Sequence, residues 1–373
     1  MQSPVSVPVF VSAKFRFHAF LAMVLLVFVH GYNLNETYLQ PYSLVREPLT
    51  FTSFFEFFTA NGLFRFRIPM LFIISGYLFA WGDATPFARR IGKRARTLLL
   101  PYFLWSALAL LFTWLLQEWP VTAAAVKAAA IDQLGDNRPY REQRWQDMLL
   151  RWTLAPTAFH LWFLRALFFY NLLYPLLRSA VTRQAAIWLP VFGLLWVLGV
   201  GLFFIEGTGL FFFSLGIWLA KRNTDLQQPP AWLPLRWGAI LWVGASAAKT
   251  LLAFYLPAHT GSLVLLTVLH KVIMFSGLIT VWWGADGLVR WWMNRPALAR
   301  LTAFSFIIYA LHVPLINYSS AWLRPLVEHL PFYRLGMYLG WPLVIIAYCV
   351  GTGWLLRRFM PGVYALLTGG RGF

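Results

Sequence analysis

Hydrophobic residues form long continuous runs along this chain, and short polar or basic stretches separate them. The runs do not alternate with a period of two, so they favour α-helices over the strands of a membrane barrel. A helix needs about 20 apolar residues to cross a hydrocarbon core of roughly 30 Å. The pattern therefore predicts an all-α integral membrane protein with about ten transmembrane helices. The expected spans are residues 15–33, 65–82, 98–117, 158–177, 186–204, 207–221, 236–256, 262–285, 302–322 and 335–356.

Composition supports this class. Hydrophobic residues make up 60% of the 373 positions and charged residues only 12%, whereas a soluble domain carries roughly 25% charged residues. We expect residues 1–373 to form a single polytopic domain. Cys349 is the only cysteine, so an intrachain disulfide is excluded. The first basic residues are Lys14 and Arg16, and no small-residue cleavage site follows the first apolar run, so we expect no cleaved signal peptide.

The net charge of +18, from 31 basic and 13 acidic residues, has two readings. In a soluble protein it would suggest nucleic acid. In a membrane protein, basic residues mark cytoplasmic loops and meet anionic headgroups, so we expect the lipid bilayer and not nucleic acid as a partner. With the N-terminus inside, the basic run at 89–96 is cytoplasmic and the long segments 34–64 and 118–157 are external. Both termini are then expected in the cytoplasm.

Ionisable residues within the expected spans are mostly bases. Glu56 and Glu206 are the only carboxylates close to apolar runs. A cation-coupled carrier usually needs a buried carboxylate, so this interior favours an anionic ligand. Each base also has a plainer interpretation: His30 can be an interfacial donor, and Arg65 and Arg67 membrane-edge anchors. Lys249 is expected to extend to a headgroup. The bases in question are His30, Arg65, Arg67, His160, Arg165, Lys249, His270, Lys271 and His312.

The chain contains no zinc-spaced set of Cys and His residues and no Gly-rich phosphate loop. We therefore expect no metal site and no permanently bound cofactor.

Four strings occur in order along nearly the whole chain. They are RIPMLFIISGYLF at 67–79, LPY at 100–102 after the basic run 89–96, HLWFL at 160–164, and FSFIIYALHVP at 304–314. Together they resemble the signatures of membrane acyltransferase family 3, the acyl-CoA-dependent O-acyltransferases of bacterial surface carbohydrates. The resemblance implies a multi-pass protein of the bacterial inner membrane.

One position departs from the family pattern. The family's first span usually carries an arginine eleven residues before a histidine; His30 matches the histidine, but Ala19 occupies the arginine position. Arg16 is the nearest basic residue. Its offset of three residues is close to one helical turn, so Arg16 keeps roughly the same face and is displaced toward the cytosol.

The resemblance implies transfer of an acyl group, with acetyl expected, from cytosolic acyl-CoA to a hydroxyl of a carbohydrate acceptor. His30 would act as a general base or would itself be acylated first. The implied acyl-CoA contacts are Arg16, Ser75, Gly76, Arg90, Arg94 and Arg96, and the implied acceptor or oxyanion contacts are Arg67, His160, Trp162, Arg165, Tyr309 and His312.

Other interpretations remain open at this stage. The basic run can be an ordinary cytoplasmic loop, and the Ser75-Gly76 pair can let two helices approach instead of admitting a pantetheine arm. A carrier or flippase for an anionic lipid-linked sugar would use the same interior bases. A structural or sensor protein without activity would account for Ala19.

Overall fold

The computed structural model describes residues 7–36, 38–136, 138–202, 204–230 and 234–372. This part of the chain is mostly helical, with one small antiparallel pair of strands, β1 (Gly201–Leu202) and β2 (Ile205–Glu206). The α-helices are α1 (Val9–His30), α2 (Phe51–Ala60), α3 (Arg67–Trp81), α4 (Phe87–Arg94), α5 (Leu100–Leu116), α6 (Pro120–Ala129), α7 (Trp145–Thr153), α8 (Trp162–Leu172), α9 (Tyr174–Arg183), α10 (Ala185–Val197), α11 (Gly207–Lys221), α12 (Leu235–Tyr255), α13 (Thr260–Gly284), α14 (Asp286–Met293), α15 (Pro296–Leu301), α16 (Ser305–Val327), α17 (Tyr333–Phe359) and α18 (Pro361–Thr368). The short 3₁₀ or π turns are η1 (Leu63–Phe66), η2 (Ala95–Leu99), η3 (Tyr140–Glu142), η4 (Phe159–Leu161) and η5 (Thr302–Phe304).

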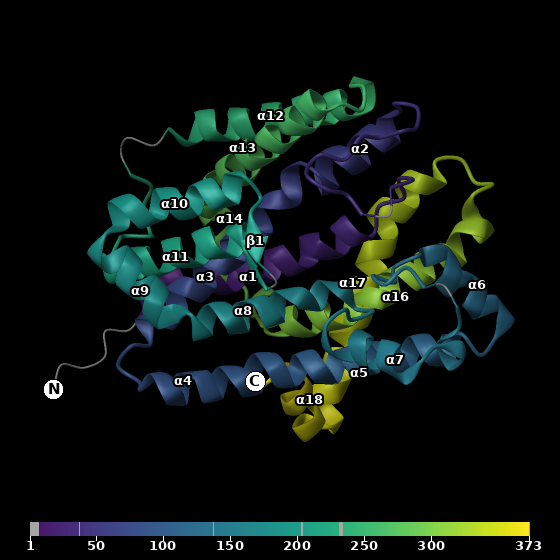
Figure 1. Cartoon of the computed structure of the whole chain (residues 1–373), viewed down its shortest axis with the longest axis horizontal. Helices are drawn as coiled ribbons and strands as arrows, with labels where there is room; N and C mark the ends of the chain where they lie inside the picture. Colours follow the sequence, from purple (N-terminus) through teal and green to yellow (C-terminus); the bar gives the residue numbers. More distant parts are fainter. Residues whose placement is uncertain (1–6, 37, 137, 203, 231–233, 373) are drawn as a thin grey trace.

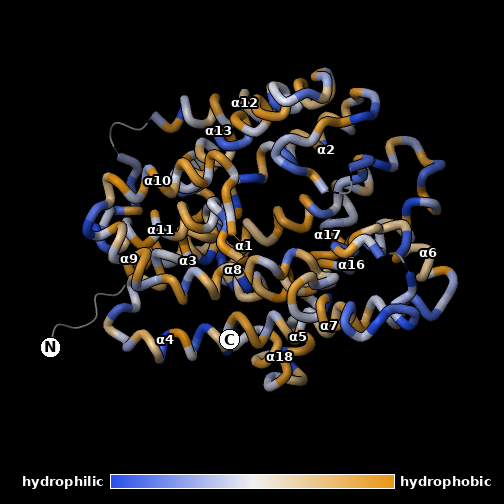
Figure 2. The backbone as a smooth tube through the Cα atoms, in the orientation of Figure 1, coloured by the Kyte–Doolittle hydropathy of each residue, from blue (hydrophilic) through white to orange (hydrophobic). Residues whose placement is uncertain are grey.

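Seven helical stretches of the described chain are long and apolar enough to cross a membrane, and α10 and α11 are shorter apolar helices. Nine of the ten expected spans lie along helices, whereas the span 186–204 is helical only as far as Val197, the last residue of α10. The span 158–177 corresponds to η4, α8 and the start of α9. Figure 2 shows hydrophobic colours along most helices and hydrophilic colours around α7 and beside α9. The seven stretches are Val9–His30, Phe51–Trp81, Phe87–Leu116, Leu235–Tyr255, Thr260–Gly284, Pro296–Val327 and Tyr333–Phe359.

The expected external segment 34–64 differs from the structure at its second half, because residues 51–60 form α2 and continue through η1 into α3. Thr50 begins α2 with a capping box: its hydroxyl accepts from the Ser53 N–H, and the Ser53 hydroxyl accepts from the Thr50 N–H. Glu56 interrupts the apolar pattern but is fully buried, where it accepts the Asn33 N–H at 2.9 Å. The charge of Glu56 therefore hid the apolar character of α2 in the sequence, although the folded protein supplies this carboxylate with a hydrogen-bond donor.

The centre of the bundle is the packing of α3 against α11, beside α1 (Figure 1). Gly76 of α3 lies against the backbone of Phe213, and Gly216 of α11 lies against the backbone of Ile73. A β-carbon at either glycine would overlap a carbonyl oxygen of the facing helix. Small residues permit this close approach when lipid offers no hydrophobic drive for association.

Gly76→Ala is therefore expected to destabilise the protein by about 1–3 kcal/mol, because the added methyl group forces α3 away from α11. Thermal unfolding in detergent measures this effect. Gly244→Ala is the matched control, because a β-carbon at Gly244 in α12 meets no atom within 4 Å. Alanine favours a helix by about 1 kcal/mol over glycine, so the control should melt at the same temperature or higher. Equal melting of the two variants would contradict the close packing.

Candidate active site

His30, the last residue of α1, lines a cavity of about 810 Å³ at one end of the bundle. Residues of α1, the η1–α3 junction, the η4–α8 junction and α16 line this chamber, together with residues 32–36 and 38–40. Five of the residues predicted from sequence line it together. They are His30, Arg67, His160, Trp162 and Tyr309.

Three histidines from three different elements pack together beside the chamber. The ring of His312 lies 5.5 Å from that of His30 and 4.6 Å from that of His160, measured between ring centroids. Phe159 also contacts His30, edge to face, with the ring centroids 5.0 Å apart. His30 has no hydrogen-bond partner among the described residues, so its ring is held by packing and its nitrogens stay available to a ligand.

The protonation of His312 follows from its neighbours. Its Nδ1 lies 3.0 Å from the Ile308 carbonyl oxygen and 2.8 Å from the Tyr309 carbonyl oxygen, and both of these groups only accept. We therefore assign the proton to Nδ1, which leaves a buried lone pair on Nε2 without a partner. The helix breaks directly after this residue: Val313 has φ −111° and ψ 133°, because Pro314 disfavours a helical conformation before it.

His160 is buried at 3% exposure, and neither of its ring nitrogens has a hydrogen-bond partner in the part of the chain that the structure describes. Tyr309 holds its backbone, since the tyrosine hydroxyl donates to the His160 carbonyl oxygen at 2.8 Å. A buried polar group without a partner costs about 1–3 kcal/mol, and such groups collect where a ligand completes them. No three His, Cys, Asp or Glu side chains in the described ranges are grouped so that they could hold a metal ion.

Two arginines add unbalanced positive charge to the chamber. Arg67 is 3% exposed, and among the described residues its guanidinium donates only to the Phe64 carbonyl oxygen, at 3.3 Å. Arg65 donates to the Leu39 carbonyl oxygen at 2.8 Å. In the part of the chain that the structure describes, no carboxylate pairs with either side chain, and both Nε atoms lack a partner. Such a pair can bind an anionic group or stabilise a developing oxyanion.

The mouth of the chamber is polar and carries residues from loops and from α16. Tyr38 closes one side by donating its hydroxyl to the Ile131 carbonyl oxygen at 2.9 Å, and burial raises the pKa of Tyr38 to about 12, so the hydroxyl stays a donor. Asn317 contributes a buried amide oxygen without a partner. The other polar residues of the mouth are Asn33, Asn35, Glu36, Gln40, Ser320 and Arg324.

Eight of the predicted site residues do not line the chamber: Arg16, Ser75, Gly76, Arg90, Arg94, Arg96, Arg165 and His312. Arg165 donates to the Leu154 carbonyl oxygen and the Tyr102 hydroxyl, so it ties α8 to the segments around α5 and α7. Gly76 packs against α11, as expected if the Ser75-Gly76 pair lets two helices approach each other. Its neighbour Ser75 is half-buried.

The basic run lies on α4 and η2, at the opposite end of the α4–α5 stretch from the segment that follows α5. Arg90 pairs with Asp83 at 2.9 Å and stacks over the ring of Phe79. Burial works against the charge of Asp83, but hydrogen bonds from Lys221 and Tyr174 outweigh it and hold the pKa of this carboxyl below its usual range. Arg90 is thus anchored within the protein.

The neighbours of Arg90 have no such anchor. Arg94 lies over the same Phe79 ring at 5.4 Å and has no ion-pair partner among the described residues. Arg96 is exposed to the surroundings. Of the implied acyl-CoA contacts on α4 and η2, these two arginines are therefore the ones whose charge remains available to a ligand.

On α1, Arg16 is exposed and Lys14 is the buried base. The Lys14 ammonium pairs with Asp286 at 2.7 Å and lies 4.7 Å from the centre of the Trp282 ring. Lys14 and Asp286 therefore fix α1 to α14. The buried base of α1 is therefore Lys14, which is paired with Asp286, whereas the Arg16 side chain is exposed.

Lys249 does not extend to a headgroup, contrary to expectation. Its side chain is fully buried on α12, where the ammonium donates to the Asn61 carbonyl oxygen and contacts His270 Nδ1, both at 2.9 Å. The carbonyl at the end of α2 supplies a partner that the sequence of α12 alone does not reveal. Lys249 thereby secures the turn that leads into Arg65 and Arg67.

Comparison with known proteins identifies the class of this chain. The family model of acyltransferase family 3, described as an acyltransferase domain, matches residues 20–356. The chain therefore belongs to this family of membrane acyltransferases, as the four strings had indicated.

Similarity extends over nearly the full length of one curated relative. The chain is 27% identical over 369 residues to the succinoglycan biosynthesis protein ExoH of Rhizobium meliloti (strain 1021), which covers 97% of this chain and 93% of that protein. No solved structure matches significantly.

Proposed function

We propose that this protein transfers an acyl group from acyl-CoA to a hydroxyl of a carbohydrate acceptor, with His30 at the reacting atoms. One observation carries the proposal: His30 and Arg67 line the same chamber, and among the described residues the His30 imidazole has no hydrogen-bond partner and Arg67 no carboxylate partner. A base beside a site of unbalanced positive charge suits attack on a thioester carbonyl, whose oxygen becomes negative in the transition state.

In this mechanism the acceptor oxygen forms a bond to the acyl carbon, and the carbon–sulfur bond of the thioester breaks. The hydroxyl proton passes to His30 and then to the leaving thiolate, so the products are the ester and free CoA. An imidazole suits this task because its ordinary pKa is about 6.5. In the two-step variant His30 attacks first, and the acceptor then takes the acyl group from its ring.

We place the donor's phosphates at the basic end and the acceptor at the chamber mouth. Arg94 and Arg96 supply available positive charge at the basic end, which suits the cytoplasmic face, where both termini would then lie. This arrangement uses about ten crossings of a bacterial inner membrane, with α8 to α11 included among them.

A carbohydrate acceptor suits the polar mouth, where the amide of Asn317 and the side chains of Asn35 and Gln40 can exchange hydrogen bonds with sugar hydroxyls. The printed name of the relative, a succinoglycan biosynthesis protein, supports a polysaccharide or its lipid-linked precursor as the acceptor.

Reconstitution into vesicles tests the proposal. Labelled acetyl-CoA, propionyl-CoA and succinyl-CoA are supplied on the side of the basic run, and unacylated glycans from cells lacking this protein on the other side. We expect label in the glycan and release of free CoA. Movement of unmodified glycan without any donor would instead indicate a carrier, and absence of both transfer and CoA binding would refute the proposal.

A further inference from the structure

A second cavity of about 410 Å³ adjoins the chamber. It lies between α6, the end of α5, α16 and the loop that follows α6. Ile131 lines both cavities, so the two meet at this residue. None of the residues assigned to the transfer step lines the second cavity, which therefore needs an explanation of its own.

The helix α6 separates the two cavities. Ala123, Ala124 and Lys127 recur at helical spacing and line the second cavity. Ala128 and Ala129 line the chamber. Because these alanines have small side chains, the helix leaves volume open on both sides while its body packs against α16.

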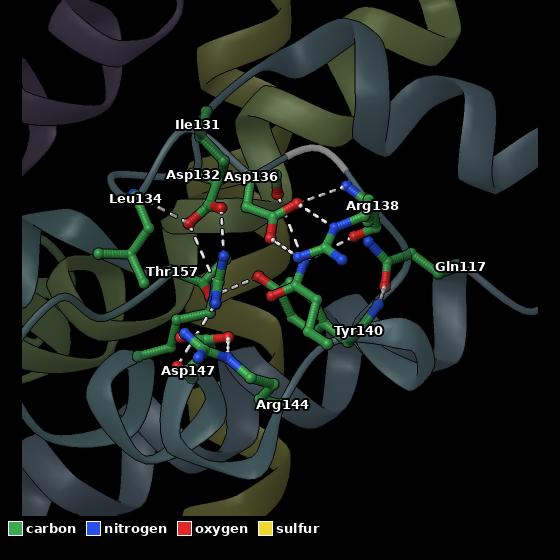
Figure 3. Close-up of polar contacts among 12 residues, drawn as sticks. Gln117, Ile131, Asp132, Leu134, Asp136, Arg138, Tyr140, Arg144, Asp147 and Thr157 are labelled. Atoms are coloured by element: carbon green, nitrogen blue, oxygen red, sulfur yellow. Dashed lines mark hydrogen bonds and ion pairs between the residues drawn. The ribbon is translucent and has the colours of Figure 1, made fainter.

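Polar contacts hold the walls of the second cavity in place (Figure 3). The buried Arg151 pairs with Asp132 at 2.5 Å, and the Tyr140 hydroxyl lies 2.9 Å from the Thr157 hydroxyl. Gln117 of α5 accepts the Tyr140 N–H at 2.9 Å. A site held in this way binds a ligand without first paying to order its own loops.

The lining combines the groups that recognise sugars. Tyr140 and Tyr318 offer aromatic rings, Gln117 an amide, and Lys127 an ammonium that has no ion-pair partner in the described part of the chain. Asp136 lies at the rim, where hydrogen bonds from Arg138 lower its pKa to about 2, so it remains an acceptor. Hydroxyl-rich ligands use such alternating donors and acceptors beside apolar faces.

We propose that the second cavity is a subsite for the sugar units that adjoin the acylated one. The acceptor is then an oligosaccharide or polymer and not a free sugar, and it contacts the residues of α5, α6 and η3 that line the second cavity. This inference rests on the proposed function, because continuity through Ile131 places the second cavity next to the sugar that enters the chamber.

Ala124→Phe tests the subsite by filling it from α6. The matched control is Val121→Phe, because Val121 is on the same helix, 67% exposed, and lines neither cavity. The acceptors are unacylated glycans from cells lacking this protein, hydrolysed and fractionated by length down to the single sugars. The measurements are label incorporated per fraction, the KM for each fraction, and hydrolysis of labelled acyl-CoA without acceptor.

Wild type and Val121→Phe should show a lower KM for longer fractions. Ala124→Phe should raise the KM of the long fractions about tenfold, which corresponds to about 1.4 kcal/mol. Its KM for single sugars, its donor hydrolysis and its melting temperature should match the control. Lys127→Ala, which removes a charge without adding volume, should also raise the KM of the long fractions.

The two levels of failure are distinguishable. Label in no fraction would refute the proposed function itself. Label in all fractions with the same length dependence in wild type and Ala124→Phe would refute only the subsite, as would an equal loss on single sugars and long fractions.

Discussion

His30→Ala is expected to reduce acyl transfer about 10²–10⁴-fold, the usual contribution of a well-placed general base. The structure gives the physical reason: among the described histidines that border the chamber, His30 is the one whose ring has neither a hydrogen bond nor full burial. His312 donates through Nδ1 to backbone carbonyls, and His160 is buried deeper. The measurement is transfer of label from acyl-CoA to glycan per folded protein in detergent.

His329→Ala is the matched control, because His329 is exposed between α16 and α17 and does not line the chamber. Its activity should equal that of wild type. Binding of CoA should be unchanged in both variants, since the proposed phosphate contacts lie at the other end. Label retained on denatured wild-type protein, but absent from His30→Ala, would favour the acylated-histidine route. Full activity of His30→Ala would remove His30 from the chemistry.

Much of the fold was predictable because apolar runs of sufficient length have few alternatives in lipid. Nine of the ten expected spans lie along helices, and 186–204 is helical only as far as Val197. Seven helical stretches of the described chain are long and apolar enough to cross a membrane. The helix α2 was missed because Glu56 breaks the apolar pattern, and only the tertiary structure brings the Asn33 N–H and Arg334 to that carboxylate. The same reason explains Lys249, whose partner is a carbonyl oxygen 188 positions away in the chain. Partners that distant leave no trace in local spacing.

The chamber was predictable in part. The strings around Arg67, His160 and Tyr309 pointed to residues that the fold does bring together. The sequence could not distinguish Lys14 from Arg16, because the two lie on the same stretch of helix and only the position of Asp286 decides which is paired. The second cavity had no signal beyond an alanine-rich stretch, since small residues indicate close packing as readily as open volume.

Arg67→Met is expected to reduce acyl transfer about 10²–10³-fold without lowering stability. Methionine keeps much of the length of arginine but removes a buried charge that no carboxylate balances. Replacing a buried ion by an apolar side chain of similar volume is often neutral or stabilising, because the desolvation cost disappears. Catalysis should suffer nonetheless, since nothing else at that position can stabilise negative charge on the thioester oxygen.

The paired measurement of melting temperature and activity separates this role from a structural one. Arg67→Lys keeps the charge but loses the fork of donors, so its activity should lie between those of wild type and Arg67→Met. A purely structural Arg67, anchored through the Phe64 carbonyl oxygen, would show the reverse pattern: a lower melting temperature and full activity per folded molecule. A chamber that stabilises an anionic transition state requires an arginine that raises activity without adding to stability. The reason is that the negative charge that pairs with this arginine arrives only with the substrate.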